Sequence, residues 1–347
     1  MMQTGNVPGP SVKRIEDSWD RIGLIQILLM PISWLFGLVV WLRRNAYRAG
    51  WVTVERLPVP VIVVGNISAG GTGKTPLVVW LCNFLIDHGY QPGVVSRGYG
   101  GTGELQEVTT DSEPDAVGDE PILIARRARC PIFVGRDRVA AARALLEAHP
   151  KCDIILSDDG LQHYRMARDF EIAVVDGAKG FGNGFMLLAG PLREPRSRLS
   201  QVDAVVLNGK SSVNIPGQTF SMNLEGNIFH NILDPDARVT AKQFQGKRIH
   251  AVAGIGNPRR FFRHLKSLDL RFSEHAFPDH HDFKVKDLDF TDADVVIMTE
   301  KDAVKCEPFA QDHWWYLSVD AKVDNALQEL ITSYLLSRSW TENFSKS

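Results

Sequence analysis

A glycine-rich stretch, GNISAGGTGKTP (residues 65–76), directly follows the apolar run at residues 61–64. Between a strand and a helix, such a loop lets backbone N–H groups approach phosphates at the helix N-terminus. Lys74 then reaches the terminal phosphates, and the Thr75 hydroxyl can ligate Mg²⁺. The stretch departs from the strict GxxxxGK[ST] pattern because Ser68 replaces the first glycine. We predict that it binds a nucleoside triphosphate. The candidate phosphate-binding residues are Ser68, Ala69, Gly70, Gly71, Thr72, Gly73, Lys74 and Thr75.

A second stretch, CDIILSDDGLQH, ends an apolar run in two carboxylates, Asp158 and Asp159. A carboxylate at the carboxyl end of a parallel strand can face the metal of a neighbouring phosphate loop. The alternative is an aspartate pair that caps the following turn. Because a phosphate loop is present, we predict that the pair supplies a metal ligand.

Three further stretches combine glycine, arginine and carboxylates: SRGYGG, VGDEP and FGNGFMLLAGPLREPRSRL. Arg97 follows an expected strand and Asp119 begins an expected helix, so both can lie at the carboxyl edge of the sheet. Arg193, Arg196 and Arg198 can bind a phosphate that is not the nucleotide's. The alternative for each arginine is a solvated surface position.

Two adjacent histidines, His280 and His281, lie in the stretch FPDHHDF, in an expected loop. No HxxxH or cysteine spacing accompanies them, which favours a catalytic or orienting role over a closed metal site. The four cysteines form no CxxC pair, as is typical of reduced cytosolic thiols. A net charge of −2 gives no sign of nucleic-acid binding, and no feature indicates an obligate protein partner.

Apolar runs alternate with helix-like segments through the first two thirds of the chain, which is typical of a parallel sheet covered on both faces. The expected strands lie at residues 59–64, 93–96, 131–134, 152–156, 171–175 and 204–207, and the expected helices at 75–88, 120–129 and 138–149.

After residue 209 this alternation of strands and helices ends. Residues 211–245 indicate a ribbon or linker, and a smaller α/β pattern then begins at 248–253, with another strand at 294–298. We predict an α/β fold: a P-loop NTPase-type parallel sheet with helices on both faces, a smaller α/β second domain and an N-terminal membrane-associated helix. The expected divisions are residues 1–50, 51–210 and 211–347.

An uncharged stretch, IGLIQILLMPISWLFGLVVWL, occupies residues 22–42 and is long enough to cross a bilayer as a helix. Arginines follow it at once, which indicates a cytoplasmic C-terminal end. In a helix that crosses the bilayer, a kink and two polar groups would lie near the middle of the membrane, at Pro31, Gln26 and Ser33. Embedding from the cytoplasmic face is therefore favoured over a full span. The alternative is a buried core helix.

With these residues in view, the chain resembles the tetraacyldisaccharide 4′-kinase family over nearly its whole length. The resemblance is carried by the apolar N-terminal segment and by GNISAGGTGKTP, SRGYGG, VGDEP, SDDGLQH, FGNGFMLLAGPLREP, FPDHHDF and MTEKDAVK. It implies ATP and Mg²⁺ as requirements, two lobes joined by a β-ribbon, a lipid disaccharide substrate and a place on the cytoplasmic face of the inner membrane.

The resemblance also implies residue roles. The family's metal-binding acid falls on Asp158, and its Arg-Glu pair near the metal falls on Arg193 and Glu194. Its catalytic Asp–His dyad falls on Asp119 and a histidine of DHH, for which we prefer His280 to His281. The expected sites are catalytic Asp119, His280 and Lys74; metal-binding Thr75, Asp158 and Glu194; and substrate-binding Arg97, Arg193 and Asp159.

Two other classes of protein remain open at this point. One is a membrane-bound ATPase switch whose loop also reads GGxGKT; that class carries a lysine before the two glycines, where this chain has Ala69. The other is a nucleotide-binding regulator without chemistry, which would not need Asp119 or His280.

Overall fold

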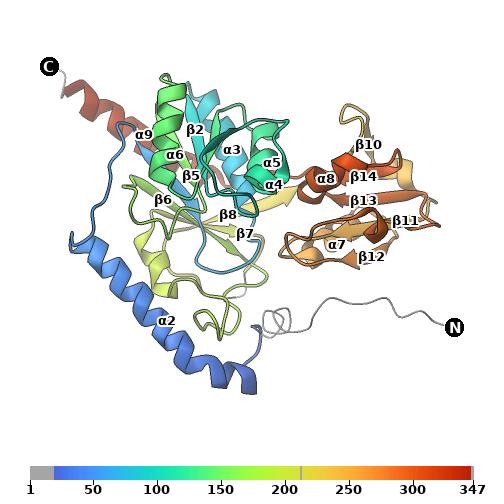
Figure 1. Ribbon diagram of the computed structural model, residues 1–347, viewed down its shortest axis with the longest axis horizontal. Coiled ribbons are helices and arrows are strands. Elements are labelled where there is room, and N and C mark those ends of the chain that lie inside the picture. Colours follow the sequence, from blue (N-terminus) through green and yellow to red (C-terminus); the bar gives the residue numbers. More distant parts are fainter. Residues whose placement is uncertain (1–18, 212, 345–347) are drawn as a thin grey trace.

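The computed structural model describes residues 19–211 and 213–344, which form a larger and a smaller α/β unit and one long helix that contacts the larger unit. Figure 1 shows the larger unit in the centre, the smaller one on the right, and α2 (Leu24–Arg48) along the lower left. The predicted fold class is confirmed.

The larger unit is built on a 9-stranded sheet with the order β15-β8-β7-β6-β1-β5-β2-β4-β3. All pairs from β8 to β4 are parallel, and the edge strands β15 and β3 are antiparallel to their neighbours. The expected strands appear as β1, β2, β4, β5, β6 and β7. The strands are β1 (Val61–Gly65), β2 (Pro92–Ser96), β3 (Gln106–Val108), β4 (Ile132–Val134), β5 (Ile154–Asp158), β6 (Phe170–Asp176), β7 (Ala204–Asn208), β8 (Thr219–Glu225) and β15 (Asp320–Val323).

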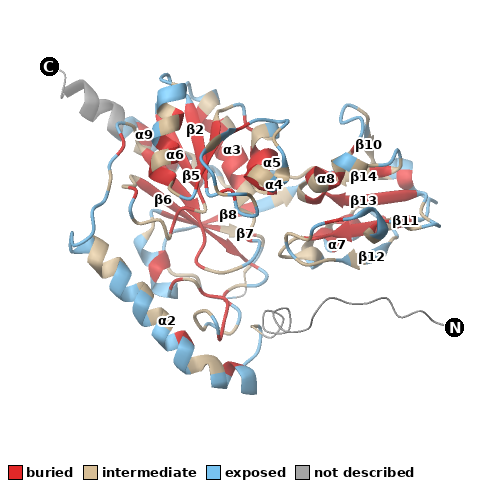
Figure 2. Ribbon diagram, viewed as in Figure 1, coloured by how far each residue is buried: buried red, intermediate tan, exposed pale blue. Residues whose placement is uncertain are grey.

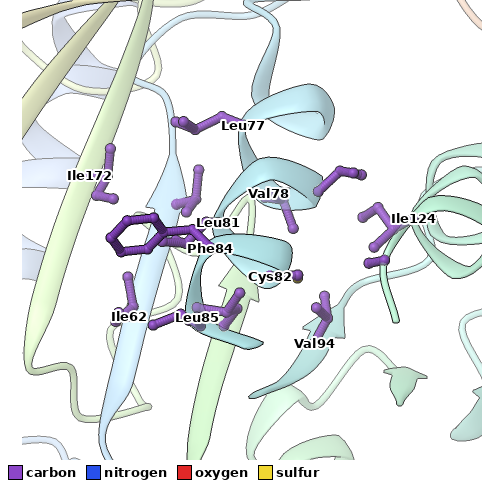
Figure 3. Packing of buried hydrophobic residues seen from close by; sticks show 14 of the residues in the cluster. Ile62, Leu77, Val78, Leu81, Cys82, Phe84, Leu85, Val94, Ile124 and Ile172 are labelled. Atoms are coloured by element: carbon purple, nitrogen blue, oxygen red, sulfur yellow. The ribbon is translucent and has the colours of Figure 1, made fainter. Parts of the chain in front are cut away.

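Helices cover both faces of this sheet because successive side chains of each inner strand point to opposite faces. On β1, Ile62 and Val64 belong to one apolar cluster, and Val61 and Val63 to the other. Figure 3 shows α3 packing its apolar side chains over the first face. The helices of this unit are α3 (Lys74–Asp87), α4 (Pro114–Val117), α5 (Asp119–Arg127), α6 (Arg138–Ala148) and α9 (Asn325–Phe344).

The smaller unit has a 6-stranded sheet with the order β10-β9-β14-β13-β11-β12. Each of its two apolar clusters contains large aromatic residues, with Phe229 and Phe261 on one face and Trp314 and Phe283 on the other. Its elements are β9 (Ile228–Asn231), β10 (Arg238–Thr240), β11 (Ile249–Ala253), α7 (Pro258–Ser267), β12 (Ser273–Ala276), β13 (Val295–Thr299), α8 (Glu300–Cys306) and β14 (Trp314–Leu317).

The chain enters the smaller unit through β8 and leaves it through β15, and these two strands pair antiparallel at the edge of the larger sheet. The sequence division at residue 210 would assign both strands, and α9, to the second domain. We therefore propose a second domain that begins after β8 and ends before β15. The reason is physical: α9 buries Leu327, Ile331 and Leu335 in the core of the larger unit.

Helix α2 has its polar and apolar faces reversed relative to a helix on a soluble protein. Gln26 and Ser33 face the protein and are buried, and the Ser33 hydroxyl donates a hydrogen bond to the Met186 carbonyl at 2.8 Å. Leu28 and Trp34 point away and are 68% and 65% exposed. Figure 2 shows this exposure along the helix. The helix also continues through Pro31, and its two polar side chains are buried against protein atoms.

Candidate active site

The glycine-rich loop joins β1 to α3 at the centre of the larger sheet. Gly70 and Gly73 have φ angles of 97° and 90°, a region that favours glycine. A Cβ atom on Gly73 would lie 2.2 Å from the Asn208 side-chain nitrogen, which donates to the Thr72 carbonyl at 2.9 Å. The loop is therefore fixed by a residue on β7. Asn208 carries no motif in the sequence and was not predicted.

Asp158 is the last residue of β5 and lies beside Val64 of β1, so its carboxylate adjoins the phosphate loop. It is buried, and one oxygen accepts a hydrogen bond from the Ser96 hydroxyl at 3.1 Å. The other oxygen is buried without a hydrogen-bond partner among the described residues. Burial, with the carboxylates of Glu120 and Asp159, raises the pKa of Asp158 to about 7.

These features fit a bound Mg²⁺, because a cation would contact the unpartnered oxygen and offset the repulsion among the carboxylates. No group of three carboxylate, imidazole or thiol side chains in residues 19–211 and 213–344 could hold a metal alone. Mg²⁺ in phosphate-transfer sites uses one or two protein groups together with phosphate and water. Asp158 and Thr75 are the residues that would hold it.

The raised pKa of Asp158 gives a pH prediction. A proton occupies this carboxylate below pH 7 and must leave when the metal binds, so the apparent affinity for Mg²⁺ with ATP should fall as pH drops below about 7, by up to roughly tenfold per unit. The KM for the Mg²⁺–ATP complex, measured from pH 6 to 8.5, checks this. The same KM in Asp158→Asn should be high at every pH; a wild-type KM independent of pH over this range would contradict the assignment.

Asp159, the neighbouring carboxylate, faces two cations. The Lys74 ammonium lies 3.4 Å from one of its oxygens and the Arg193 guanidinium 3.0 Å from the other. Burial alone would raise the pKa of Asp159, but these cations and Arg138 lower it to about 2. Asp159 therefore stays ionised and holds Lys74 beside the phosphate loop.

Asp119 and His280 meet across the cleft between the two units. Asp119 is the first residue of α5 and is buried, and its Oδ2 lies 3.2 Å from His280 Nδ1. His280 has a φ angle of 56° and packs against the ring of Tyr99, with the ring centres 4.8 Å apart. His281 instead contacts Asp287 at 3.2 Å. The structure thus brings His280, rather than His281, to Asp119.

Two lysines of α8 surround this pair. The Lys301 ammonium contacts Glu120 at 2.8 Å, His280 Nε2 at 3.3 Å and Asp119 at 3.9 Å, and the Lys305 ammonium lies 3.7 Å from Asp119. An ammonium has no acceptor, so Lys301 donates to Nε2, and His280 then donates its Nδ1 proton to Asp119. Burial would raise the pKa of Asp119, but His280 and the two lysines lower it.

Both lysines belong to the stretch MTEKDAVK, for which no catalytic or binding role was predicted. Their contacts join positions far apart in the chain: Lys301 and Glu120 are 181 residues apart. No local spacing pattern signals such a contact.

Among the described residues, the side chains of two other predicted site residues, Glu194 and Arg97, form no hydrogen bond or ion pair with the phosphate loop or the Asp119–His280 pair. Glu194 is fully buried, accepts hydrogen bonds from Gln162 at 2.7 Å and Tyr164 at 2.6 Å, and lies 3.4 Å from Arg198. None of these partners belongs to the phosphate loop, so its metal-binding role stays a prediction with less support than that of Asp158. Arg97 is exposed at the end of β2.

A cavity of about 330 Å³ lies between the phosphate loop and the smaller unit. Apolar side chains from both units, including Val79, Leu123 and Phe261, form part of its wall. Arg260 and Asn257 of the smaller unit reach Asp176 of the larger unit at 2.6 and 3.0 Å, and so hold the two walls together. The cavity is large enough for part of a nucleotide beside the loop.

Comparison with known proteins agrees with this geometry. The family model for tetraacyldisaccharide-1-P 4′-kinase matches residues 25–336. Tetraacyldisaccharide 4′-kinase from Methylobacillus flagellatus is 49% identical over 329 residues, covering 94% of this chain and 97% of that protein. The same enzyme from Nitrosococcus oceani is 51% identical over 310 residues, covering 89% and 90%. A crystal structure of LpxK from Aquifex aeolicus in complex with ATP superposes with a TM-score of 0.75 at 28% identity, covering 90% and 99%.

Proposed function

This chain belongs to the tetraacyldisaccharide-1-P 4′-kinase family, and on that premise we propose that Asp119, paired with His280, is the general base of its reaction. The protein is a kinase of lipid A biosynthesis: it uses ATP to phosphorylate the 4′ position of a tetraacyl disaccharide. The family match favours this activity over an ATPase switch or a regulator without chemistry. The observation that carries the proposal is the 3.2 Å contact between Asp119 and His280 beside the phosphate loop.

Transfer of a phosphoryl group passes through a loose transition state, so positioning and charge stabilisation supply most of the catalysis. Lys74 reaches the β- and γ-phosphates, and backbone N–H groups of the loop and the N-terminus of α3 cradle them. A bound Mg²⁺ would supply positive charge to the transferred phosphates. Thr75 and Asp158 are the residues that would hold it.

Asp119 accepts the proton of the 4′-hydroxyl as that oxygen forms its bond to the γ-phosphorus and the bond to ADP breaks. His280 orients the carboxylate through the Nδ1–H hydrogen bond, and Lys301 and Lys305 keep it ionised. His280 and both lysines come from the smaller unit, whereas Asp119 belongs to the larger one. The base is therefore complete only when the two units are together.

The residues proposed to bind the substrate in the cleft are Arg97, Arg193 and Asp159. Arg193 is held by Asp159 at 3.0 Å, next to Lys74, so it can contact both the sugar and the transferred phosphoryl group. Arg97, exposed at the end of β2, has its guanidinium available for a polar substrate group.

An experiment on coupling tests the proposed base. ADP release by the wild-type protein should require the lipid acceptor and should match the lipid phosphate formed, one for one. ATP hydrolysis that proceeds equally well without the lipid would show that the site activates water and would contradict the proposal.

We further propose that α2 embeds this kinase in the cytoplasmic face of the inner membrane. Of the described helices, only α2 is long and apolar enough to cross a membrane. Buried core helices can also meet that criterion, but the apolar side chains of α2 face outward. The substrate supplies a reason, since lifting one acyl chain of about ten CH₂ groups out of a bilayer costs roughly 8 kcal/mol.

This proposal gives a prediction for the outward face of α2. Leu28→Glu with Leu35→Glu should release the protein from membranes and lower activity on bilayer substrate at least roughly tenfold, because charged side chains resist insertion. ATP binding should survive, and activity on detergent-dispersed substrate should fall less. Flotation with vesicles and both activity assays measure this.

The matched control is Leu105→Glu with Leu233→Glu, which places the same charges at leucines that are 51% and 53% exposed elsewhere on the surface. Equal membrane binding by the α2 variant and the wild type would rule out the embedding. A reporter fused at residue 1 separates the two topologies, since periplasmic exposure would mean a full span.

A further inference from the structure

A second pocket, separate from the catalytic cleft, lies where the C-terminal end of α2 meets the segment that follows β5. Its volume is about 330 Å³. The residues around it are Arg44, Tyr47, Arg48, Val54, Tyr164 and Arg168, with Glu171, Arg198 and Gln201 at its base. We call this the α2 pocket.

Positive charge exceeds negative charge in the α2 pocket. Four of its side chains are guanidinium groups and one is a carboxylate, Glu171. Glu171 is already shared, because Arg168 contacts it at 3.0 Å and Arg198 also donates to it. It leaves no carboxylate for the two arginines of α2.

Arg44 and Arg48 both donate to a single neutral acceptor, the side-chain oxygen of Gln201. Neither forms an ion pair with a carboxylate in the described part of the chain. Burial, followed by the charges of Arg198 and Arg48, lowers the pKa of Arg44, although the buried Glu194 carboxylate acts in the opposite direction. Unneutralised guanidinium groups arranged around a cavity are suited to a bound anion, and their planar forks match phosphate oxygens.

The position of the pocket suggests what carries the anion. The outward apolar face of α2 ends at these arginines, so they lie where lipid headgroups would be. The pocket also adjoins the catalytic cleft: Arg193 contacts Asp159 in the cleft, and the next residue, Glu194, contacts Tyr164 and Arg198 at the pocket. Two consecutive residues of one short segment therefore connect the cleft to the pocket.

We propose that the α2 pocket binds a phosphate group carried by a lipid, through Arg44 and Arg48. Two lipids can supply it: the disaccharide substrate, through its 1-phosphate, and an anionic phospholipid of the bilayer. The first source rests on the proposed function, because it places the 4′-hydroxyl at Asp119 while the opposite end of the disaccharide is held in the pocket.

The first arm of the test uses neutral detergent micelles without phospholipid. The double variant Arg44→Gln with Arg48→Gln should raise the KM for the tetraacyl disaccharide 1-phosphate about 10- to 100-fold, as expected for losing charge-assisted hydrogen bonds, with little change in kcat. Its KM for the same disaccharide without the 1-phosphate should equal that of the wild type. This result identifies the substrate phosphate.

The second arm measures binding to phosphatidylcholine vesicles with and without phosphatidylglycerol. If the phospholipid is the source, the double variant should lose the gain in binding that phosphatidylglycerol gives the wild type, while the KM ratio in micelles stays unchanged. Arg271→Gln is the control, since Arg271 is an exposed arginine of the smaller unit and does not line the pocket.

Gln201→Glu provides a second variant that keeps both arginines. The new carboxylate should pair with them and reproduce the effect of the double variant. Thermal unfolding and ATP binding check that each variant folds. An unchanged KM together with unchanged vesicle binding, or an equal loss in Arg271→Gln, would overturn the proposal. A wild-type protein that transfers no phosphate to the lipid would instead contradict the proposed function.

Discussion

Replacing Lys74 with alanine is expected to remove nearly all phosphoryl transfer. Lys74 begins α3 at the phosphate loop, and its ammonium is held 3.4 Å from Asp159. As the bond to the γ-phosphate breaks, negative charge moves toward the β-phosphate, and this lysine is the protein's cation placed to stabilise it. We expect a loss in kcat of at least roughly a hundredfold, measured with saturating ATP and lipid.

Lys151→Ala is the control, because Lys151 is an exposed lysine that lines neither the catalytic cavity nor the α2 pocket. It should retain wild-type kcat. If Lys74→Ala kept more than about a tenth of the wild-type kcat, the loop would not hold the transferred phosphates, because such a change corresponds to less than about 1.4 kcal/mol of transition-state stabilisation.

Replacing Asp119 with alanine is expected to lower kcat by roughly 10²- to 10⁴-fold, the range for general acid–base catalysis. ATP affinity should change little, because Asp119 acts on the sugar hydroxyl. His280→Ala should cost less, since His280 orients the carboxylate without receiving the proton. Steady-state kinetics on the two single variants and the double variant measure this.

The double variant should lose less than the product of the two single losses, because the two residues act as one unit. A full product of losses would mean that they act independently and would contradict the pairing. His149→Ala is the matched control: His149 forms a similar contact of 2.8 Å with Glu107, outside the cleft, and its loss should leave kcat unchanged.

The sequence predicts the larger sheet well because each inner strand is buried on both faces and therefore reads as a continuous apolar run. The phosphate loop and Asp158 follow from the same logic, since each comes directly after such a run. Strand β15, at the edge of the sheet, was not predicted. Strand β8, next to it, falls in residues 211–245, for which a ribbon or linker was expected, and it alternates buried and exposed residues along its first half.

Other features escape prediction because they depend on contacts between distant segments. Lys301 and Lys305 acquire a role only when α8 packs against α5, and Asn208 only when β7 lies beside the phosphate loop. Ser33 looks like a polar interruption of a membrane segment until its hydroxyl is seen to donate to the Met186 carbonyl. In each case the residue is visible in the sequence, but its partner is not.

The most direct measurement is the identity of the lipid product. The purified protein is incubated with ATP, Mg²⁺ and the tetraacyl disaccharide 1-phosphate, and the lipid is recovered and studied by phosphorus NMR and mass spectrometry. We expect one new phosphate monoester at the 4′ position, with the 1-phosphate retained, and at least roughly a hundredfold less of it from Asp119→Ala in the same initial time. A phosphate at another hydroxyl, or undiminished 4′ phosphorylation by Asp119→Ala, would contradict this account of the active site.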